Sequence, residues 1–310
     1  MSSSSKRPSQ IIYFSHPRAA CHLLERMLSK QPGVQLMWHP YAITRPSQIP
    51  LFTEESIAAG IPDEKRKPYL EAVEQGNQAW AKALEDAGAK GETLLMHEHP
   101  HFALDVDRGL EYVTKEWNTE KPTDNYARNF TLFPEKILLA PGTTVLLNIR
   151  HPALSGPGAF RGMSTLEHSW SRPGFLMARH LGWQREMYDW YVSKGITPIV
   201  VDAEDYMSSQ EFVRHLASKL GLDPEHCLFK WEKVSMEERA TMHPMYVKLQ
   251  QTLLDSEGMV ESKVVRKVDV DVEEEKWRKE WGDDAAKLLR ETTEASMPHY
   301  EYLMGKRLRL

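Results

Sequence analysis

An apolar strand that runs through a short turn into a helix is the feature that most restricts the fold of this chain. The segment from Gln10 to Leu28 reads QIIYFSHPRAACHLLERML, with Pro17 and Arg18 in the turn and apolar residues at helical spacing after it. A helix start offers free N–H groups and a partial positive charge, and the arginine adds a full one. The pattern predicts a phosphate or sulfate site here. The alternative is a surface arginine that pairs with a helix.

A second apolar strand ends in the same kind of residue. The segment from Val145 to Gly162 reads VLLNIRHPALSGPGAFRG, and Arg150 follows its last strand position. Because the carboxyl ends of parallel strands meet at one edge of a sheet, a second anion is expected beside the first. Two anions at one edge suit a bisphosphorylated nucleotide. Alternatively, Arg150 pairs with a carboxylate of the chain.

Apolar runs alternate with amphipathic stretches along the whole sequence, which predicts an α/β fold. We expect a single domain with a central parallel sheet and helices on both faces. The expected strands are Ile11–Ser15, Val34–Trp38, Thr93–His97, Thr144–Ile149 and Pro198–Asp202.

Three long helices are expected: Gln210 to Leu220, which stops at Gly221; the aromatic-rich Leu176 to Val192; and a last helix from about Val272 to Met297. The stretch from Pro40 to Glu64 is rich in proline and predicts a loop with short helical turns. Met236 to Ser256 is an amphipathic insertion that we expect to form a lid and an acceptor pocket over the end of the sheet. Residues 1–9 are expected to be a disordered lead-in to a domain over residues 10–305.

Composition excludes several classes of function. The chain has 310 residues, of which 41% are hydrophobic, so it can bury a large core. A net charge of −5 disfavours nucleic acid as a partner, and no apolar run reaches the roughly 20 residues that cross a membrane. The polar N-terminus has no signal-peptide pattern. Cys21 and Cys227 are then expected to be reduced, buried thiols of a cytoplasmic protein.

The two strand-end motifs resemble those of the sulfotransferases that use PAPS (3′-phosphoadenosine 5′-phosphosulfate) as donor. In that family a PRSG turn followed by Thr or Ser binds the phosphosulfate, and an R-x-P segment followed by Ser binds the 3′-phosphate. Arg18 and Arg150 match the two basic positions. The segments Val200–Glu225 and Lys276–Leu303 resemble the fungal small-molecule branch, so the likeness spans roughly residues 10 to 303. It implies a P-loop-like fold with helical lid insertions and PAPS or its product PAP as cofactor.

Several family positions are altered here. After Arg18 the chain has Ala19, Ala20, Cys21 and His22, so the hydroxyls of the family motif are absent and backbone N–H groups are left to hold an oxyanion. Gly158 stands where the family has the Ser that binds the 3′-phosphate, and Arg161 is a candidate replacement charge. We expect these residues, with Arg18 and Arg150, to line the donor site.

A third segment, LLMHEHPHF, runs from Leu94 to Phe102 at the end of a strand. The family often has Lys-x-His here, and the resemblance makes His99 the general base that removes the acceptor's proton. His97 stands where the lysine would stabilise the sulfuryl oxygens. The expected catalytic set is therefore His99, His97 and Arg18, and the expected acceptor-site residues are His101, Phe102, Phe160 and Trp170.

The same histidines allow a metal hypothesis. His97, His99 and His101 alternate on one face of the expected strand, and two of them with His16 or His39 could coordinate zinc or iron. Glu98 is expected on the other face. Because the family uses no metal, no metal is expected.

The sequence thus favours a sulfotransferase-family enzyme of specialised metabolism, which transfers a sulfuryl group from PAPS to a hydroxyl of a small molecule. One alternative keeps the fold without PAPS and uses the histidines for cyclisation, dehydration or condensation. Another is a binding protein without catalysis. No nucleic-acid or membrane partner is expected, and a homodimer is left open.

Overall fold

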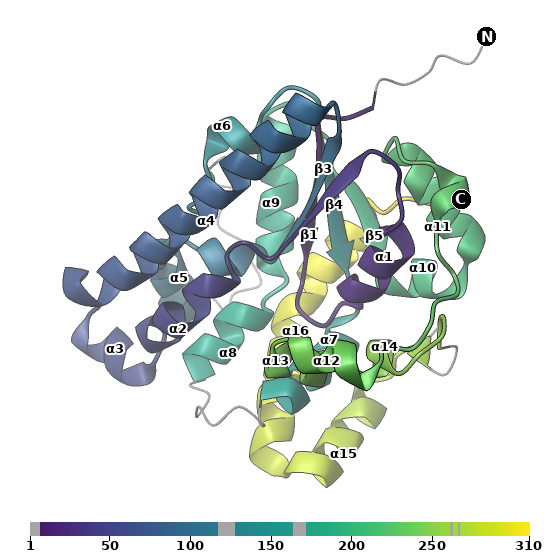
Figure 1. Cartoon of the computed structure of the whole chain (residues 1–310). Helices are drawn as coiled ribbons and strands as arrows, with labels where there is room; N and C mark the ends of the chain where they lie inside the picture. The colour runs from purple at the N-terminus through teal and green to yellow at the C-terminus, as the bar shows by residue number, and fades with distance from the viewer. Residues whose placement is uncertain (1–6, 117–127, 164–171, 261–262, 266) are drawn as a thin grey trace.

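The computed structural model describes residues 7–116, 128–163, 172–260, 263–265 and 267–310, and its centre is one parallel sheet (Figure 1). Five strands lie in the order β2-β3-β1-β4-β5. Their bounds are β1 (Gln10–Ser15), β2 (Val34–Trp38), β3 (Thr93–Glu98), β4 (Thr143–Ile149) and β5 (Ile199–Asp202). All four pairings are parallel, which confirms the predicted α/β sheet with flanking helices.

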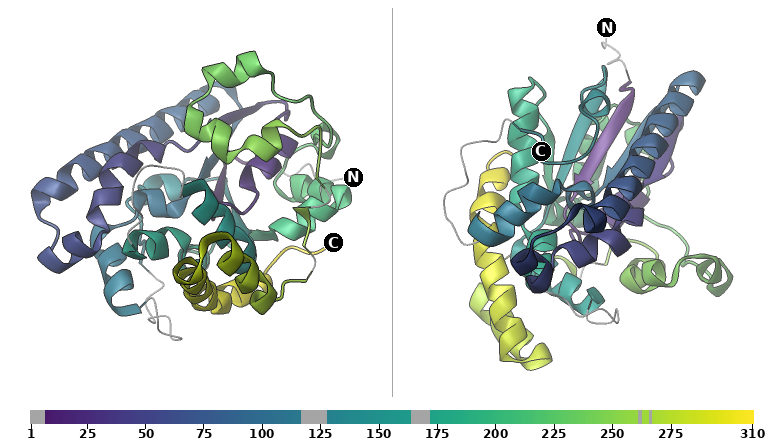
Figure 2. Two further views of the ribbon diagram at one scale, coloured as in Figure 1. Left: turned by 90° about the horizontal axis from the view of Figure 1, so that it is seen from below. Right: turned by 90° about the vertical axis from the view of Figure 1, so that its left-hand side faces the viewer.

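The burial of strand β1 on both faces of the sheet explains the continuous apolar run in this part of the sequence. All six of its residues are buried, because successive side chains enter apolar cores on opposite faces of the sheet. Ile12 and Phe14 face the helices α4 (Asp63–Lys90), α9 (Gly182–Ser193) and α16 (Asp283–Met304). Ile11 and Tyr13 face α1 (Cys21–Leu28), α10 (Ala203–Ser208) and α11 (Gln210–Lys219). Figure 2 shows the sheet between these two helical layers.

Short elements surround the carboxyl end of the sheet. The expected turns after Pro40 are present as η1 (Ala42–Thr44), α2 (Arg45–Gln48), η2 (Ile49–Leu51) and α3 (Glu54–Ala59). The insertion forms α12 (Met236–Thr241), α13 (Pro244–Leu249) and α14 (Gln251–Leu254), which lie beyond the strand ends near α7 (Pro152–Met163) (Figure 1). The other short elements are η3 (Pro100–Ala103), α5 (Val106–Glu111), η4 (Tyr112–Glu116), α6 (Glu135–Leu138) and η5 (Pro224–His226).

Two of the expected long helices are each divided into two helices in the structure, so the prediction of single helices there is wrong. The segment from Leu176 to Val192 is divided between α8 (Arg172–Arg179) and α9. The helix is interrupted because the Leu181 amide donates to the Ser296 hydroxyl at 3.3 Å, and the next residue, Gly182, is a poor helix former. The last helix divides into α15 (Val270–Trp281) and α16 at Gly282, whose φ of 87° interrupts the ladder. The expected helix at Gln210 is confirmed as α11, and Gly221 follows it with a φ of 73°.

The pairing register brings three strand ends to one edge. Tyr13 pairs with His97, Phe14 with Glu98, and Ser15 with Asn148, so β1, β3 and β4 end side by side. Both cysteines are buried and free, as predicted. Among the described helices, none has the length and apolar character needed to cross a membrane.

Candidate active site

The turn between β1 and α1 has a strained backbone that its neighbours hold in place. Arg18 and Ala20 have φ values of 66° and 54°, which side chains other than glycine rarely adopt. The carbonyl of Ala19 accepts hydrogen bonds from Asn148 Nδ2 at 2.9 Å and from the Tyr206 hydroxyl at 2.7 Å. Because β4 and α10 thus fix the turn, its conformation is set before any ligand binds.

Arg18 lies in this turn on the carboxyl edge of the sheet, as the sequence predicted, and it contacts α13. Its Nη1 donates to the carbonyl of Leu249 in α13 at 2.6 Å. Burial lowers the pKa of Arg18, and the charges of Arg150 and Arg161 lower it further. The three expected donor-site arginines therefore lie near one another.

Two of these arginines are paired with carboxylates of the chain. Arg150 donates to Glu204 at 3.0 Å, the pairing that was the alternative hypothesis for this residue. Arg161 is exposed and binds Glu280 at 2.9 and 2.8 Å. Gly158 lies against Arg18, and a Cβ at that position would be 3.5 Å from Cβ and Nε of Arg18. The backbone thus leaves room for a serine there.

Arg179 of α8 is a further buried cation beside the turn, and no motif in the sequence drew attention to it. Its side chain is only 3% exposed, and its Nη1 donates to the carbonyl of Pro17 at 2.8 Å. Among the residues that the structure describes, its Nε and Nη2 have no hydrogen-bond partner. Burial, and then the charge of Arg18, lowers its pKa to about 9. Buried donors without acceptors are costly, so the arrangement is typical of a site for a negatively charged ligand.

A third cation, the half-buried Arg45, also lies close enough to His101 for its charge to act on it. The Arg45 guanidinium stacks on the Phe102 ring at 5.3 Å, and burial lowers its pKa to about 10. Burial lowers the pKa of His101 well below its usual value, and the charges of Arg45 and Arg179 act in the same direction. Positive charge and neutral imidazole therefore share this part of the strand edge.

His99 is held in a neutral state with one ring nitrogen unprotonated. Its Nδ1 lies 2.9 Å from the carbonyl of Ser15 and 2.9 Å from the hydroxyl of the same residue. A carbonyl only accepts, so Nδ1 carries the proton and Nε2 keeps a free electron pair. Burial lowers the pKa of His99 well below its usual value, and the neighbouring histidines lower it further.

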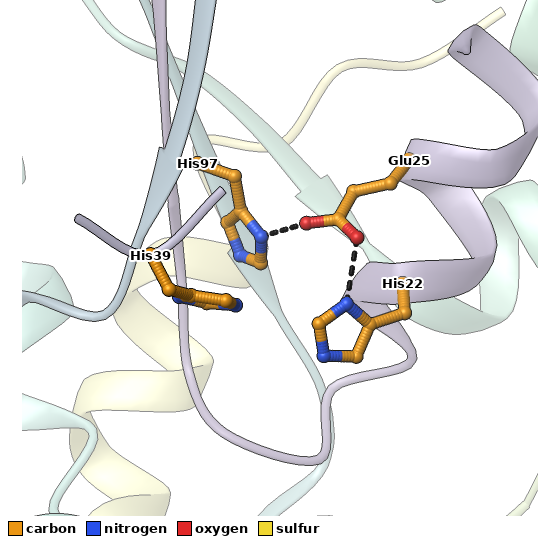
Figure 3. Close-up of side chains that lie close together, drawn as sticks. All are labelled: His22, Glu25, His39 and His97. Carbon is orange, nitrogen blue, oxygen red and sulfur yellow. Dashed lines mark hydrogen bonds and ion pairs between the residues drawn. The ribbon is translucent and has the colours of Figure 1, made fainter. Parts of the chain in front are cut away.

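His97 belongs to a second, adjoining cluster (Figure 3). The Glu25 carboxylate contacts Nδ1 of His97 and accepts from Nδ1 of His22 at 2.6 Å. Burial favours the acid form of Glu25, but the two imidazoles outweigh it and hold the pKa of Glu25 well below its usual value. Burial lowers the pKa of His97 to about 3. The pair therefore consists of a carboxylate and a neutral imidazole.

His39 completes this cluster from the loop after β2. Its Nδ1 lies 3.0 Å from Glu98 Oε1, and its ring centroid lies 4.3 Å from that of His97. Burial favours the neutral form of His39, but the hydrogen bond and the charge of Glu98 outweigh it, so the pKa of His39 is raised. Glu25 was not among the expected site residues, although its spacing of three residues from His22 puts both on one face of α1.

Other expected site residues lie as follows. His101 is not on the strand, because β3 ends at Glu98 and His101 belongs to η3, where its ring stacks on His99 at 5.8 Å. Burial raises the pKa of Cys21 to about 12, so its sulfur stays a thiol. Phe160 packs on Phe175 and Trp281, with ring centroids 5.9 and 5.1 Å away. Trp170 lies outside the described residues.

No protein-family model matches the chain, but two curated fungal proteins do. It is 28% identical to the sulfotransferase ppzF of Metarhizium majus (strain ARSEF 297), over 349 aligned residues that cover 100% of this chain and 99% of the relative. It is also 28% identical to sulfotransferase ppzF of Metarhizium rileyi (strain RCEF 4871), with the same coverage over 341 residues. The resemblance to fungal sulfotransferases is confirmed.

Two solved sulfotransferases are among its structural neighbours. The sulfotransferase of Alicyclobacillus acidocaldarius has a TM-score of 0.40 and 15% identity, and the match covers 81% of this chain and 96% of that one. The sulfotransferase domain of the Synechococcus PCC 7002 olefin synthase has a TM-score of 0.38 and 13% identity, and the match covers 93% and 95%. The likeness to these two fungal sulfotransferases indicates that the chain is a transferase enzyme with a sulfotransferase-type function.

Proposed function

We propose that the chain transfers a sulfuryl group from PAPS to a hydroxyl of a small molecule. The proposal is supported by the groups that lie together at the carboxyl edge of the sheet. There a strained, fixed turn with the half-buried Arg18 and the buried Arg179 adjoins a neutral His99 whose Nε2 carries no proton. Cations beside a base are what sulfuryl transfer needs, because the sulfuryl oxygens are negative and the acceptor must lose a proton.

His99 would act as the base. The acceptor oxygen forms a bond to sulfur while the bond from sulfur to the phosphate oxygen of PAPS breaks, PAP leaves with that electron pair, and the hydroxyl proton moves to Nε2 of His99. The hydrogen bond from Nδ1 to the Ser15 carbonyl fixes the ring and stabilises the imidazolium that forms. No further reactant is needed.

Arg18 and Arg179 would bind the negative oxygens of the group in transfer. Arg179 has two buried donor nitrogens without a partner among the described residues, whereas Arg18 donates to the Leu249 carbonyl. A guanidinium has five N–H groups, so Arg18 could bind a phosphate or sulfate oxygen while Nη1 still donates to Leu249. Arg150 would bind the 3′-phosphate beside its present partner Glu204 or in place of it.

The test compares the wild-type chain with His99→Gln for PAP formation from PAPS, with a panel of hydroxyl-bearing small molecules as acceptors. Loss of a general base costs about 10²- to 10⁴-fold in rate, so the variant should lose at least that much turnover. His226→Gln is the matched control, because His226 is an exposed histidine on η5.

Near-normal turnover of the His99→Gln variant would place the base elsewhere. If the wild-type chain converts a hydroxyl substrate without consuming PAPS, the histidines perform acid–base chemistry on the substrate alone. That outcome would replace sulfuryl transfer with the donor-independent alternative.

A further inference from the structure

The cluster of three histidines and a glutamate beside the active site has the composition of a metal centre. We infer that His22, Glu25, His39 and His97 bind a divalent transition-metal ion of the zinc class. Each of the four side chains offers one ligand atom, and these atoms all lie within 4.8 Å of one another. Figure 3 shows the four side chains converging from α1, β3 and the loop after β2. This departs from the expectation that no metal is used.

The groups around the cluster orient the rings as they do in metal sites. The Glu98 carboxylate accepts from Nδ1 of His39, which leaves Nε2 of that ring available. A carboxylate that holds one imidazole nitrogen while the other faces a metal is a recurring arrangement. The Ser15 hydroxyl contacts Nε2 of His97 at 2.6 Å, and the opposite nitrogen of the same ring points at Glu25. Both rings are thus fixed from outside the cluster.

The backbone at His39 is constrained in a way that favours this geometry. Its φ of 44° lies in the left-handed region, and its amide donates to the carbonyl of His97 at 2.9 Å. A residue other than glycine holds this conformation only when its surroundings impose it. The backbone of His39 is therefore anchored directly to that of His97.

The charges around the cluster also suit a metal. Metal binding displaces protons from the ligands, because the ion binds neutral imidazoles and ionised carboxylates. The buried carboxylates of Glu25 and Glu98 both adjoin the cluster, so a divalent cation there would compensate negative charge.

The donor set decides the class of ion. Three imidazole nitrogens and one carboxylate oxygen suit zinc and its transition-metal neighbours, whereas magnesium and calcium prefer oxygen ligands. The ion would lie close to the proposed base, because the rings of His39 and His99 are 4.5 Å apart. The inference does not depend on PAPS.

The test uses the full-length chain, purified without a polyhistidine tag. Elemental analysis should find about one zinc-class ion per chain. After removal of metal by a chelator, calorimetric titration with Zn²⁺ should show one site, and Co²⁺ should give the visible absorption of tetrahedral cobalt. If the purified chain contains no metal and binds neither Zn²⁺ nor Co²⁺ on titration, the inferred metal site does not exist.

Variants locate the site. Glu98→Gln removes the charged group behind His39 and should weaken zinc binding about 10- to 100-fold, and His39→Gln should weaken it more. The control is His226→Gln, because His226 and Asp223 form an exposed pair with the same three-residue spacing as His22 and Glu25. Far-ultraviolet circular dichroism checks that each variant is folded. If folded His39→Gln binds zinc as tightly as the wild type, the ion lies elsewhere.

Discussion

The neutral histidines at the strand edge make a quantitative prediction about stability and pH. His101 is 3% exposed, and burial holds its pKa well below 6.5 in the folded chain. Below pH 6.5 the unfolded chain binds a proton at this position that the folded chain does not, so the free energy of unfolding falls as the pH falls. From pH 7.5 to pH 5 this one group costs about 2 kcal/mol of stability.

The assay is urea unfolding followed by tryptophan fluorescence at several pH values, with a chelator present. Because His101→Gln cannot take up the proton, its loss of stability between pH 7.5 and pH 5 should be smaller than that of the wild type by about 2 kcal/mol. The exposed-site variant His226→Gln should behave like the wild type. Equal losses in wild type and His101→Gln would show that His101 titrates normally, and the argument for neutral buried imidazoles would then be wrong.

Three further predictions concern the anion site. Arg179→Met should weaken PAPS binding about 10- to 100-fold, because a charge-assisted hydrogen bond to the donor is lost. Calorimetric titration measures the affinity for PAPS, and an unchanged affinity would show that Arg179 does not bind the donor. Asn148→Ala should lower the free energy of unfolding by about 1–3 kcal/mol, since the Tyr13 hydroxyl and Ala19 carbonyl lose a partner; urea unfolding tests this. Gly158→Ser should fold normally and bind PAP about 2- to 10-fold more tightly by the same titration, whereas weaker binding would mean that the hydroxyl does not face the phosphate.

The fold was predictable because its signals are local and repeated. Strands buried on both faces read as continuous apolar runs, and each strand was placed within one residue of its observed bounds. The break between α15 and α16 has a local signal, Gly282, that the expected helix ran through. The break between α8 and α9 was missed because it depends on a tertiary contact. The hydrogen bond from the Leu181 amide to Ser296 joins residues 115 apart, and no pattern within either helix encodes it.

The site was only partly predictable for a similar reason. Arg18 and His99 follow strands directly, so parallel topology brings them to one edge. The roles of Arg179 and His39 depend on which helix or loop packs beside that edge, and a single sequence does not determine it. The metal hypothesis relied on the alternation of His97, His99 and His101 along one strand, but the strand ends at Glu98. In the structure, His22, Glu25 and His39 complete the cluster around His97.

The proposal of sulfuryl transfer from PAPS is tested most directly by calorimetric titration of the wild-type chain with PAP. The account predicts micromolar affinity or better, and about 100-fold weaker binding for Arg150→Ala, because a buried phosphate contact with an arginine is worth about two tenfold steps. Arg214→Ala on α11 serves as the control and should bind like the wild type. Absence of heat and of any thermal shift at millimolar PAP would contradict the use of PAPS.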